Sequence, residues 1–267
     1  MAAAGIALFA ISYDSVAILR DFAAAHGITF PLLSDEGSHV MRGLGLINER
    51  VQEDHAAYGI PPNPRHVNLP YPGVFVLDAA GVVTRKVFHE SYRERDSGGG
   101  LVAQAIGLFT TSPKAATAAG PVVTVRAWLD SPTYAWFQRL TLTVEVTVAP
   151  GHHVYGQPAA AGLVPLVVEI EPLAGLEVDS VTWPEPHRLV LPGLGDEMWV
   201  HDGTVRGTLA LTFTGAPGGG SHAIGIRVAF QACSATACLI PSAVRLEVPV
   251  REVALVGRSL PTAAAKT

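Results

Sequence analysis

The sequence predicts an α/β region followed by an all-β region that folds as an antiparallel sandwich. Over residues 1–95, apolar runs typical of strands alternate with segments of helical periodicity, whereas residues 122–251 contain alternating strand patterns separated by Gly and Pro turns. The first arrangement is typical of α/β proteins and the second of sandwiches. We therefore divide the chain into an α/β domain at 1–95, a linker at 96–121, a β-sandwich at 122–251 and a loose tail at 252–267.

Composition indicates a folded chain and argues against several classes of partner. The 267 residues are 49% hydrophobic and 15% charged, which is enough apolar material for two domains with cores. The net charge of −5 and the lack of a long basic cluster give no indication of a nucleic-acid partner. No apolar run reaches the ~18 residues of a membrane-spanning helix. The apolar run from Met1 to Ile11 lacks the basic residues that begin a signal peptide.

The α/β domain opens with a continuous apolar run from Gly5 to Ser12, which predicts a central parallel strand covered on both faces. Asp14 or Ser15 can cap a following helix that runs through Ala25, and Gly27 is placed to end it. Apolar residues at helical spacing predict a buried stripe on this helix. The remaining expected elements are a strand at 30–33, a short helix introduced by residues 34–35 and running through 41–44, a polar Pro-rich loop at 49–71, and a hairpin of strands at 73–77 and 82–88.

The second half carries the clearest strand pattern in the chain. Residues 140–148 alternate apolar with hydroxyl or charged side chains without interruption, and the same alternation returns at 166–170, 209–213 and 244–250. Because successive side chains of a strand point to opposite faces, each segment is expected to bury one face. In the linker, a short apolar helix at 101–109 is expected after the glycines at 98–100.

The chain has only two cysteines, Cys233 and Cys238, separated by four residues within the β region. Opposed residues in antiparallel strands lie about 4.5–5.5 Å apart at Cα, and a disulfide requires about 4.4–6.8 Å. We therefore predict that the pair is bonded, or within bonding distance, on adjacent strand ends. The large apolar residues between Ile224 and Phe230 share one face of the preceding strand. Cys233 falls in the opposite phase, so its sulfur is expected to leave the core face.

Other interpretations of the pair are open at this point. The cysteines can form a structural disulfide or can be two inert small apolar residues, although a short loop gains little stabilisation from a cross-link. A metal site is disfavoured, because two thiols without a second ligand pair do not complete a tetrahedral site. His152 and His153 are adjacent and point to opposite faces of a strand, and the other histidines considered show no ligand spacing: His187, His201 and His222. We expect no metal and no other cofactor.

Three segments of the β region resemble the amino-terminal, periplasmic domain of the thiol:disulfide interchange protein DsbD. They are Gly151–Tyr155 (Gly-His-His-Val-Tyr), Gly195–Trp199 (Gly-Asp-Glu-Met-Trp) and Gln231–Pro241, which holds both cysteines. The resemblance covers residues 122–250. It implies an immunoglobulin-like sandwich whose two cysteines alternate between dithiol and disulfide. It also implies that Cys238 forms the mixed disulfide with a partner and that Cys233 resolves it.

The same resemblance implies a cap loop over the cysteines, formed here by Asp196, Glu197, Met198 and Trp199. Family members commonly carry an aromatic residue where this chain has Met198, whose thioether can still cover a sulfur. Carboxylates near the thiols would raise the thiol pKa by charge repulsion. We interpret Tyr155, at a strand end, as a core or rim aromatic in preference to a proton donor.

Residues 1–95 resemble redoxins of the peroxiredoxin kind, the AhpC/TSA group of thioredoxin-fold proteins. The resemblance lies in Ile6–Asp14, in Phe30–Asp35 and in Pro72–Gly81, and it places Pro72 where that fold usually carries a cis-proline. The family's first core strand and cysteine-bearing helix have no counterpart, and residues 1–95 contain no cysteine. We therefore expect an N-terminally truncated domain with unpaired strand edges, with room for an export signal in the missing part. We assign no chemistry to Arg65, His66 or Pro72.

These observations predict thiol–disulfide exchange through Cys233 and Cys238, with a thioredoxin-like domain or protein as the partner. The resemblance implies a periplasmic or otherwise extracytoplasmic location, and no peroxidase activity is expected from this chain. Two alternatives stay open. One is a non-catalytic immunoglobulin-like docking module with a structural disulfide. The other is a fragment of a redoxin-type thiol peroxidase whose peroxidatic cysteine is missing here.

Overall fold

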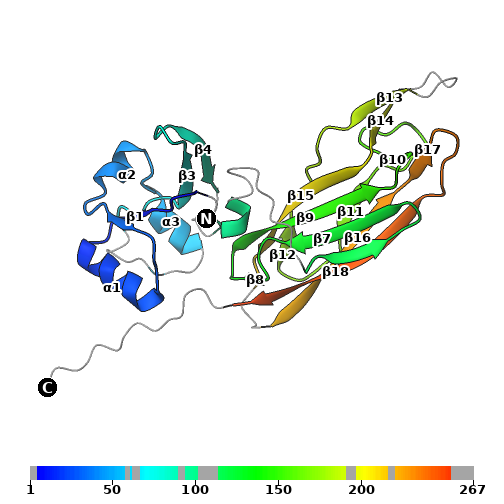
Figure 1. Cartoon of the computed structure of the whole chain (residues 1–267). Helices are drawn as coiled ribbons and strands as arrows, with labels where there is room; N and C mark the ends of the chain where they lie inside the picture. Colours follow the sequence, from blue (N-terminus) through cyan, green and yellow to red (C-terminus); the bar gives the residue numbers. More distant parts are fainter. Residues whose placement is uncertain are drawn as a thin grey trace. The chain divides into compact units, whose positions relative to one another are not determined.

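The structure is a computed structural model of the whole chain (Figure 1), and it describes residues 5–57, 61, 67–89, 94–101, 114–190, 197–215 and 220–253. Contacts between residues divide the chain into two compact units, Met1–Tyr92 and Arg93–Thr267. Across the described ranges, no helix is both long enough and apolar enough to cross a membrane.

In the first unit, helix α1 (Val16–His26) has the caps that the sequence predicts. The hydroxyl of Ser15 accepts a hydrogen bond from the backbone N–H of Ile18, and Gly27 ends the helix in the left-handed conformation with φ of 62°. The expected buried stripe is only partly present. Leu19 is buried, but Val16 is 71% exposed and Phe22 is 44% exposed.

The strands of the first unit form two separate pairs. Strand β1 (Ala10–Ser12) runs parallel to β2 (Leu32–Ser34), and β3 (Gly73–Leu77) is antiparallel to β4 (Val83–Phe88). The prediction of a central strand covered on both faces was wrong. Only the end of the run from Gly5 to Ser12 is a strand. Among the described residues this strand has a partner along one edge only, and residues 7–11 are exposed.

Two short helices complete the described part of this unit. The buried carboxylate of Asp35 accepts hydrogen bonds from the backbone of Val40 and Met41 at the start of α2 (His39–Gly43). Helix α3 (Val51–Ala57) lies inside the segment that was expected to be a loop, which corrects that prediction. The peptide bond before Pro72 is trans, because the one cis bond of the described residues precedes Pro158. The expected cis-proline is therefore absent, and Arg65 and His66 lie outside the described residues.

The second unit is a two-layered, largely antiparallel β-sandwich of the immunoglobulin-like kind (Figure 1). The first sheet has the order β12 (Leu176–Val178), β15 (Thr204–Phe213), β9 (Gln138–Val148), β7 (Val123–Leu129) and β6 (Ala116–Ala119). The second sheet has the order β11 (Val167–Ile170), β16 (Ser221–Phe230), β18 (Ser242–Glu252) and β8 (Thr133–Tyr134). Buried residues of both sheets, including alternate residues of β9 and β16, form one main core between the layers.

The predicted alternation along β9 is confirmed, although Thr143 and Glu145 on the other face are also buried. The apolar residues at alternate positions of 140–148 are 0–3% exposed. On the other face, Glu145 is also buried, and it pairs with Arg126 at 3.0 Å and with Arg206 at 2.6 Å on the neighbouring strands. Burial alone would raise the pKa of Glu145, but the two arginines hold that pKa below its usual value. The buried charge is therefore paired across three strands.

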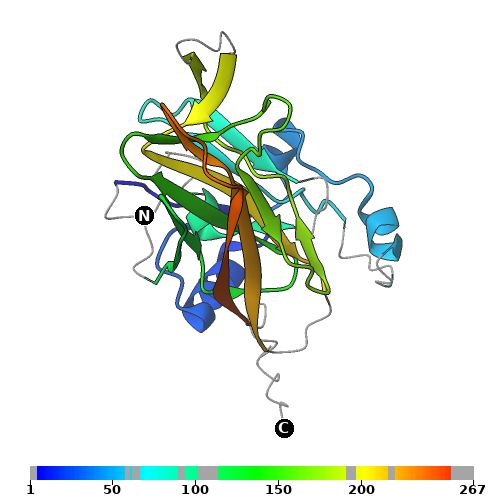
Figure 2. The ribbon, with the colours of Figure 1, turned by 90° about the vertical axis from the view of Figure 1, so that its right-hand side faces the viewer.

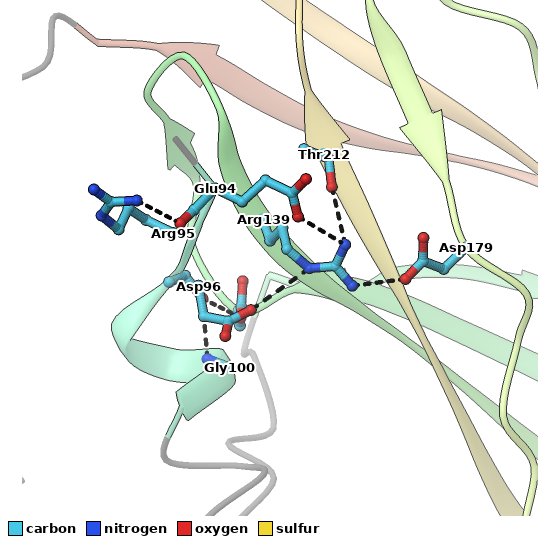
Figure 3. Close-up of polar contacts among 9 residues, drawn as sticks. Glu94, Arg95, Asp96, Gly100, Arg139, Asp179 and Thr212 are labelled. Carbon is cyan, nitrogen blue, oxygen red and sulfur yellow. Dashed lines mark hydrogen bonds and ion pairs between the residues drawn. The ribbon is translucent and has the colours of Figure 1, made fainter. Parts of the chain in front are cut away.

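Part of the expected linker belongs to the first sheet. Strand β5 (Arg95–Asp96) pairs with the beginning of β9, and β6 pairs with β7. The guanidinium of Arg139 on β9 contacts the carboxylates of Glu94, Asp96 and Asp179 at 3.6, 3.7 and 2.6 Å (Figure 3). The sheet therefore begins before residue 122. The helix expected at 101–109 and the tail from 254 onward lie outside the described residues, apart from residue 101.

A third, smaller sheet has the order β13 (His187–Val190), β14 (Glu197–His201), β10 (His152–Tyr155) and β17 (Ala232–Ser234). Three of its strands continue or precede long strands of the sandwich. β10 follows β9, β14 precedes β15 and β17 follows β16, so extensions from both layers pair with one another. Figure 2, the ribbon turned by 90°, shows β13 and β14 projecting from one end of the sandwich. This small sheet positions the cysteines.

Candidate functional site

Cys233 and Cys238 form a disulfide across a tight hairpin, as the sequence predicts. The S–S distance is 2.10 Å and the Cα atoms are 4.0 Å apart. The flanking backbone bonds join the N–H of Ser234 to the carbonyl of Ala237 at 2.8 Å and the N–H of Leu239 to the carbonyl of Ala232 at 2.9 Å. The two cysteines are therefore an antiparallel pair without mutual backbone hydrogen bonds, where opposed side chains lie closest together.

The strand phase takes the first sulfur out of the main core. β16 ends at Phe230 and β17 begins at Ala232, and these two residues both belong to the main core, so the alternation continues across Gln231. Cys233 leaves that core, as its phase predicts, but it is not exposed. It lies at 0% exposure in a second buried group, here called the sulfur cluster, whose members are Tyr155, Met198, Val200 and Cys233.

The two cysteines differ sharply in exposure. Cys233 is fully buried, whereas Cys238 is exposed on the far side of the hairpin. Thiol–disulfide exchange proceeds by attack on one sulfur, and the choice of sulfur depends on access. Cys238 is therefore the cysteine of this disulfide that other molecules can reach, and Cys233 is shielded from them.

Tyr155 contacts both sulfurs. Its hydroxyl donates a hydrogen bond to Sγ of Cys233 at 3.0 Å and lies 3.4 Å from Sγ of Cys238. Burial raises the pKa of the Tyr155 phenol, so the hydroxyl stays protonated and able to donate. The ring packs in the sulfur cluster, as a core aromatic does. The sequence predicted a core or rim aromatic at Tyr155. It did not predict the contact of the hydroxyl with the sulfurs, which depends on β10 lying beside β17.

The segment expected as a cap loop is a strand in its described part. Glu197, Met198 and Trp199 belong to β14, and Asp196 lies outside the described residues. Met198 is 8% exposed and packs in the sulfur cluster. Trp199 is half-buried on the opposite face, and Glu197 is exposed in an ion pair with Arg188. Met198 therefore covers the cysteine side of the sheet, and its two neighbours do not.

His153 was set aside in the sequence as one of two adjacent histidines, but the structure places it directly opposite Cys233. It is 7% exposed, its ring meets that of Tyr155 edge-on at 5.6 Å, and its Nε2 atom has no hydrogen-bond partner. Burial lowers the pKa of the His153 imidazole. His152 points the other way, toward the carbonyl of Pro150 at 3.2 Å.

A pocket of about 400 Å³ adjoins this side of the small sheet. Its lining includes His153, His187, Asp202 and Ala235, the last of which lies in the turn between the cysteines. Nε2 of His187 lies 3.5 Å from Oδ2 of Asp202. No group of three or more His, Cys, Asp or Glu in the described ranges is arranged to hold a metal ion.

Comparisons with known proteins identify two regions. Residues 1–86 match the AhpC/TSA family, and residues 132–249 match the family described as thiol:disulfide interchange protein DsbD, N-terminal. No curated protein matches the chain. Among solved structures, the chain is similar to the N-terminal periplasmic domain of ScsB from Proteus mirabilis, with 18% identity, a TM-score of 0.35 and coverage of 52% of this chain and 49% of that chain. The chain thus spans about half the length of that ScsB domain.

Two further structures show similarity at lower identity. The DsbD N-terminal domain of Neisseria meningitidis in the reduced form is 15% identical, with a TM-score of 0.29 and coverage of 41% of this chain and 77% of that chain. The GAE domain of GGA2p from Saccharomyces cerevisiae is 7% identical, with a TM-score of 0.31 and coverage of 50% and 96%. The chain therefore carries a thioredoxin-like AhpC/TSA region at residues 1–86, followed by an immunoglobulin-like DsbD N-terminal domain at residues 132–249 that holds the Cys233–Cys238 disulfide.

Proposed function

We propose that the chain performs thiol–disulfide exchange at Cys233–Cys238 and passes reducing equivalents to or from a thioredoxin-like partner. The observation that carries this proposal is the difference between an exposed Cys238 and a fully buried Cys233. An exchange reaction needs an accessible sulfur for attack, and Cys238 supplies one. A cross-link that only stabilises the fold needs no exposed sulfur, and a ring this small contributes little through chain entropy.

The reaction follows from this asymmetry. In the reductive direction, a thiolate of the partner attacks Sγ of Cys238, the bond to Cys233 breaks, and Cys233 leaves as a thiolate. A second thiol of the partner then attacks the mixed disulfide and releases Cys238. The partner loses two electrons and the chain gains them. Tyr155 donates a hydrogen bond to the leaving sulfur and therefore stabilises its negative charge.

The surroundings of Cys238 favour a protein partner. Ile240 is 85% exposed, the largest exposure among the large apolar residues of the described ranges. Leu239 packs against the main core, so its two neighbours point away from that core. A docked protein would cover Ile240 beside the reacting sulfur, and burying such a side chain is favourable. We expect Ile240→Ser to slow reduction by thioredoxin and to leave reduction by dithiothreitol unchanged.

An extracytoplasmic location fits this function, because disulfides persist in oxidising compartments. It is supported by the family match and by the similarity to a domain described as periplasmic. The peroxidase alternative receives no support from residues 1–92, which contain no cysteine.

Single-cysteine variants test the proposal. With Cys233→Ser, the exposed Cys238 remains as a free thiol, and with Cys238→Ser only the buried Cys233 remains. The partner is a thioredoxin whose second active-site cysteine is replaced and whose remaining cysteine is held in a mixed disulfide with an aromatic thiol, which leaves as a thiolate when a chain thiolate attacks. We expect Cys233→Ser to form a mixed disulfide with this thioredoxin at least about tenfold faster than Cys238→Ser does. Equal rates, or faster trapping through Cys233, would contradict the assignment of Cys238 as the attacked sulfur.

A further inference from the structure

When the disulfide is reduced, Cys233 carries a thiol proton, and this proton must be removed before Cys233 can react again. To resolve a mixed disulfide at Cys238, Cys233 must react as a thiolate, and to leave from the disulfide it must depart as one. Its site is fully buried, and a buried charge is costly unless it is paired or hydrogen-bonded. Tyr155 supplies a hydrogen bond but cannot remove the thiol proton, because burial raises the pKa of its own phenol.

His153 is placed to meet this need. It faces Cys233 in the antiparallel pair of β10 and β17, where Cβ atoms of opposed residues lie about 4.5–5.5 Å apart. It is 7% exposed, and its Nε2 atom is buried without a hydrogen-bond partner. An unpaired buried ring nitrogen costs stability. The edge-on contact between the rings of His153 and Tyr155 does not give this nitrogen a hydrogen-bond partner.

The pocket beside the small sheet completes the arrangement. His153 lines it together with the exposed His187 and Asp202. The imidazole therefore lies between Cys233 on the neighbouring strand and an open, partly polar space. A group in this position can receive a proton on one side and release it to solvent on the other.

We propose that His153 is the proton acceptor for Cys233 when the dithiol is oxidised, and that the adjoining pocket connects it with solvent. The inference rests on the proposed exchange function. In the reduced protein, the Cys238 thiolate attacks a disulfide R–S–S–R, which gives a mixed disulfide and one R–S⁻. The thiol proton of Cys233 passes to His153, and the Cys233 thiolate attacks Sγ of Cys238. The second R–S⁻ leaves, the chain's disulfide closes, and His153 releases its proton into the pocket.

The charges around His153 are consistent with this role. Burial lowers the pKa of the imidazole, and nearby His187 and His152 lower it further. Asp202 acts in the opposite direction. His201 lies on the other face of β14, and Glu197 is engaged with Arg188. At neutral pH the imidazole is therefore neutral and able to accept a proton.

The closure step can be followed on the full chain with Ellman's reagent, an aromatic disulfide whose thiolate is coloured. Reduced protein should release colour in two phases, a bimolecular phase from attack by Cys238 and a unimolecular phase from closure by Cys233. We expect His153→Gln to slow the second phase at least about tenfold near pH 7, because general bases typically contribute 10²–10⁴-fold. The first phase should be unchanged. The matched control is His201→Gln, since His201 is also buried, with its pKa also lowered by burial, but faces away from the cysteines.

The pH dependence supplies a readout that misfolding of a variant cannot imitate. In the unsubstituted protein, the closure rate should fall as the pH drops through the pKa of His153 and should be level above it, until the thiol itself ionises. In His153→Gln the rate should instead rise about tenfold per pH unit, because free thiolate is then required. The role of His153 would be overturned if the unsubstituted protein shows this steady rise, or if the His153→Gln variant closes its disulfide at the normal rate. Loss of both colour phases in the unsubstituted protein would overturn the exchange function itself.

Discussion

The hydroxyl of Tyr155 lies between the two sulfurs of the disulfide, 3.0 Å from Sγ of Cys233 and 3.4 Å from Sγ of Cys238. Tyr155→Phe keeps the ring in the sulfur cluster and removes only this donor. A hydrogen bond to a charged group is worth about 1.5–3 kcal/mol, which corresponds to a thiolate pKa change of about 1–2 units. With a Brønsted slope of about 0.5, we expect reduction by dithiothreitol to slow about three- to tenfold.

Tyr134→Phe is the matched control for that prediction. Tyr134 is also a buried tyrosine, and its ring stacks on Phe213, away from the sulfur cluster. Stopped-flow measurement of disulfide reduction at one pH compares the two variants. Unaltered reduction of Tyr155→Phe would mean that the hydroxyl does not stabilise the leaving sulfur.

The second prediction concerns the shield over Cys233. Met198 packs in the sulfur cluster, whereas Trp199 lies on the opposite face of β14. We expect Met198→Ala to speed alkylation of Cys233 in the reduced protein and Trp199→Ala to leave it unchanged. Cys238 should be alkylated first in every variant, because it is exposed. Mass spectrometry of iodoacetamide-treated protein over time distinguishes the two sites, and equal acceleration by both variants would argue against a specific shield at Met198.

The third prediction concerns the buried carboxylate of the first sheet. Glu145→Gln leaves Arg126 and Arg206 without their shared partner, and we expect the free energy of unfolding at neutral pH to fall by about 1–3 kcal/mol. The control is Glu169→Gln, where an exposed pair with Arg227 is lost and the expected change is about 0–1 kcal/mol.

This contribution of Glu145 should depend on pH. Because the folded-state pKa lies below the ordinary value of 4.5, the stabilisation is present above that value and is lost as the pH falls through the folded pKa. Urea unfolding at neutral pH and near pH 3 should therefore show a difference between Glu145→Gln and the unsubstituted protein that shrinks in acid. A constant difference would show that packing, and not charge, is responsible.

The fourth prediction concerns the first unit. Residues 1–92 contain no cysteine, and the thiolate is the group that attacks a peroxide or a disulfide. The chain should show no peroxidase turnover with a thiol donor. All disulfide reductase activity should be lost in the Cys233→Ser, Cys238→Ser double variant. Activity that survives this variant would require a reactive group other than the two cysteines.

Local pattern predicted the parts of the fold that depend on local causes. The alternation over 140–148 identified a half-buried strand because successive side chains point to opposite faces. The caps of α1 followed from Ser15 and Gly27, and the cysteine spacing was sufficient for a bonded pair. Helix α3 was missed because its buried face consists of only Val51 and His55, a pattern too short to show helical periodicity.

The site itself depended on contacts that the sequence does not encode locally. The burial of Cys233 arises because extensions of β9 and β16, from opposite layers, pair with each other as β10 and β17. The same pairing brings Tyr155 to the sulfurs and His153 opposite Cys233. In the sequence, the adjacency of His152 and His153 was considered only as a possible metal pair, and that question did not reveal that His153 faces Cys233.

The reduction potential of the Cys233–Cys238 disulfide tests the central claim most directly. The purified protein is equilibrated with dithiothreitol or glutathione buffers of defined potential, and the bonded fraction is measured by mass spectrometry after acid quenching and alkylation. An exchange-active disulfide with an exposed sulfur should have a potential above about −300 mV, whereas structural disulfides usually lie below that value. A potential well above −300 mV is the result we expect. A potential below it would identify the bond as a structural cross-link and contradict the proposed function.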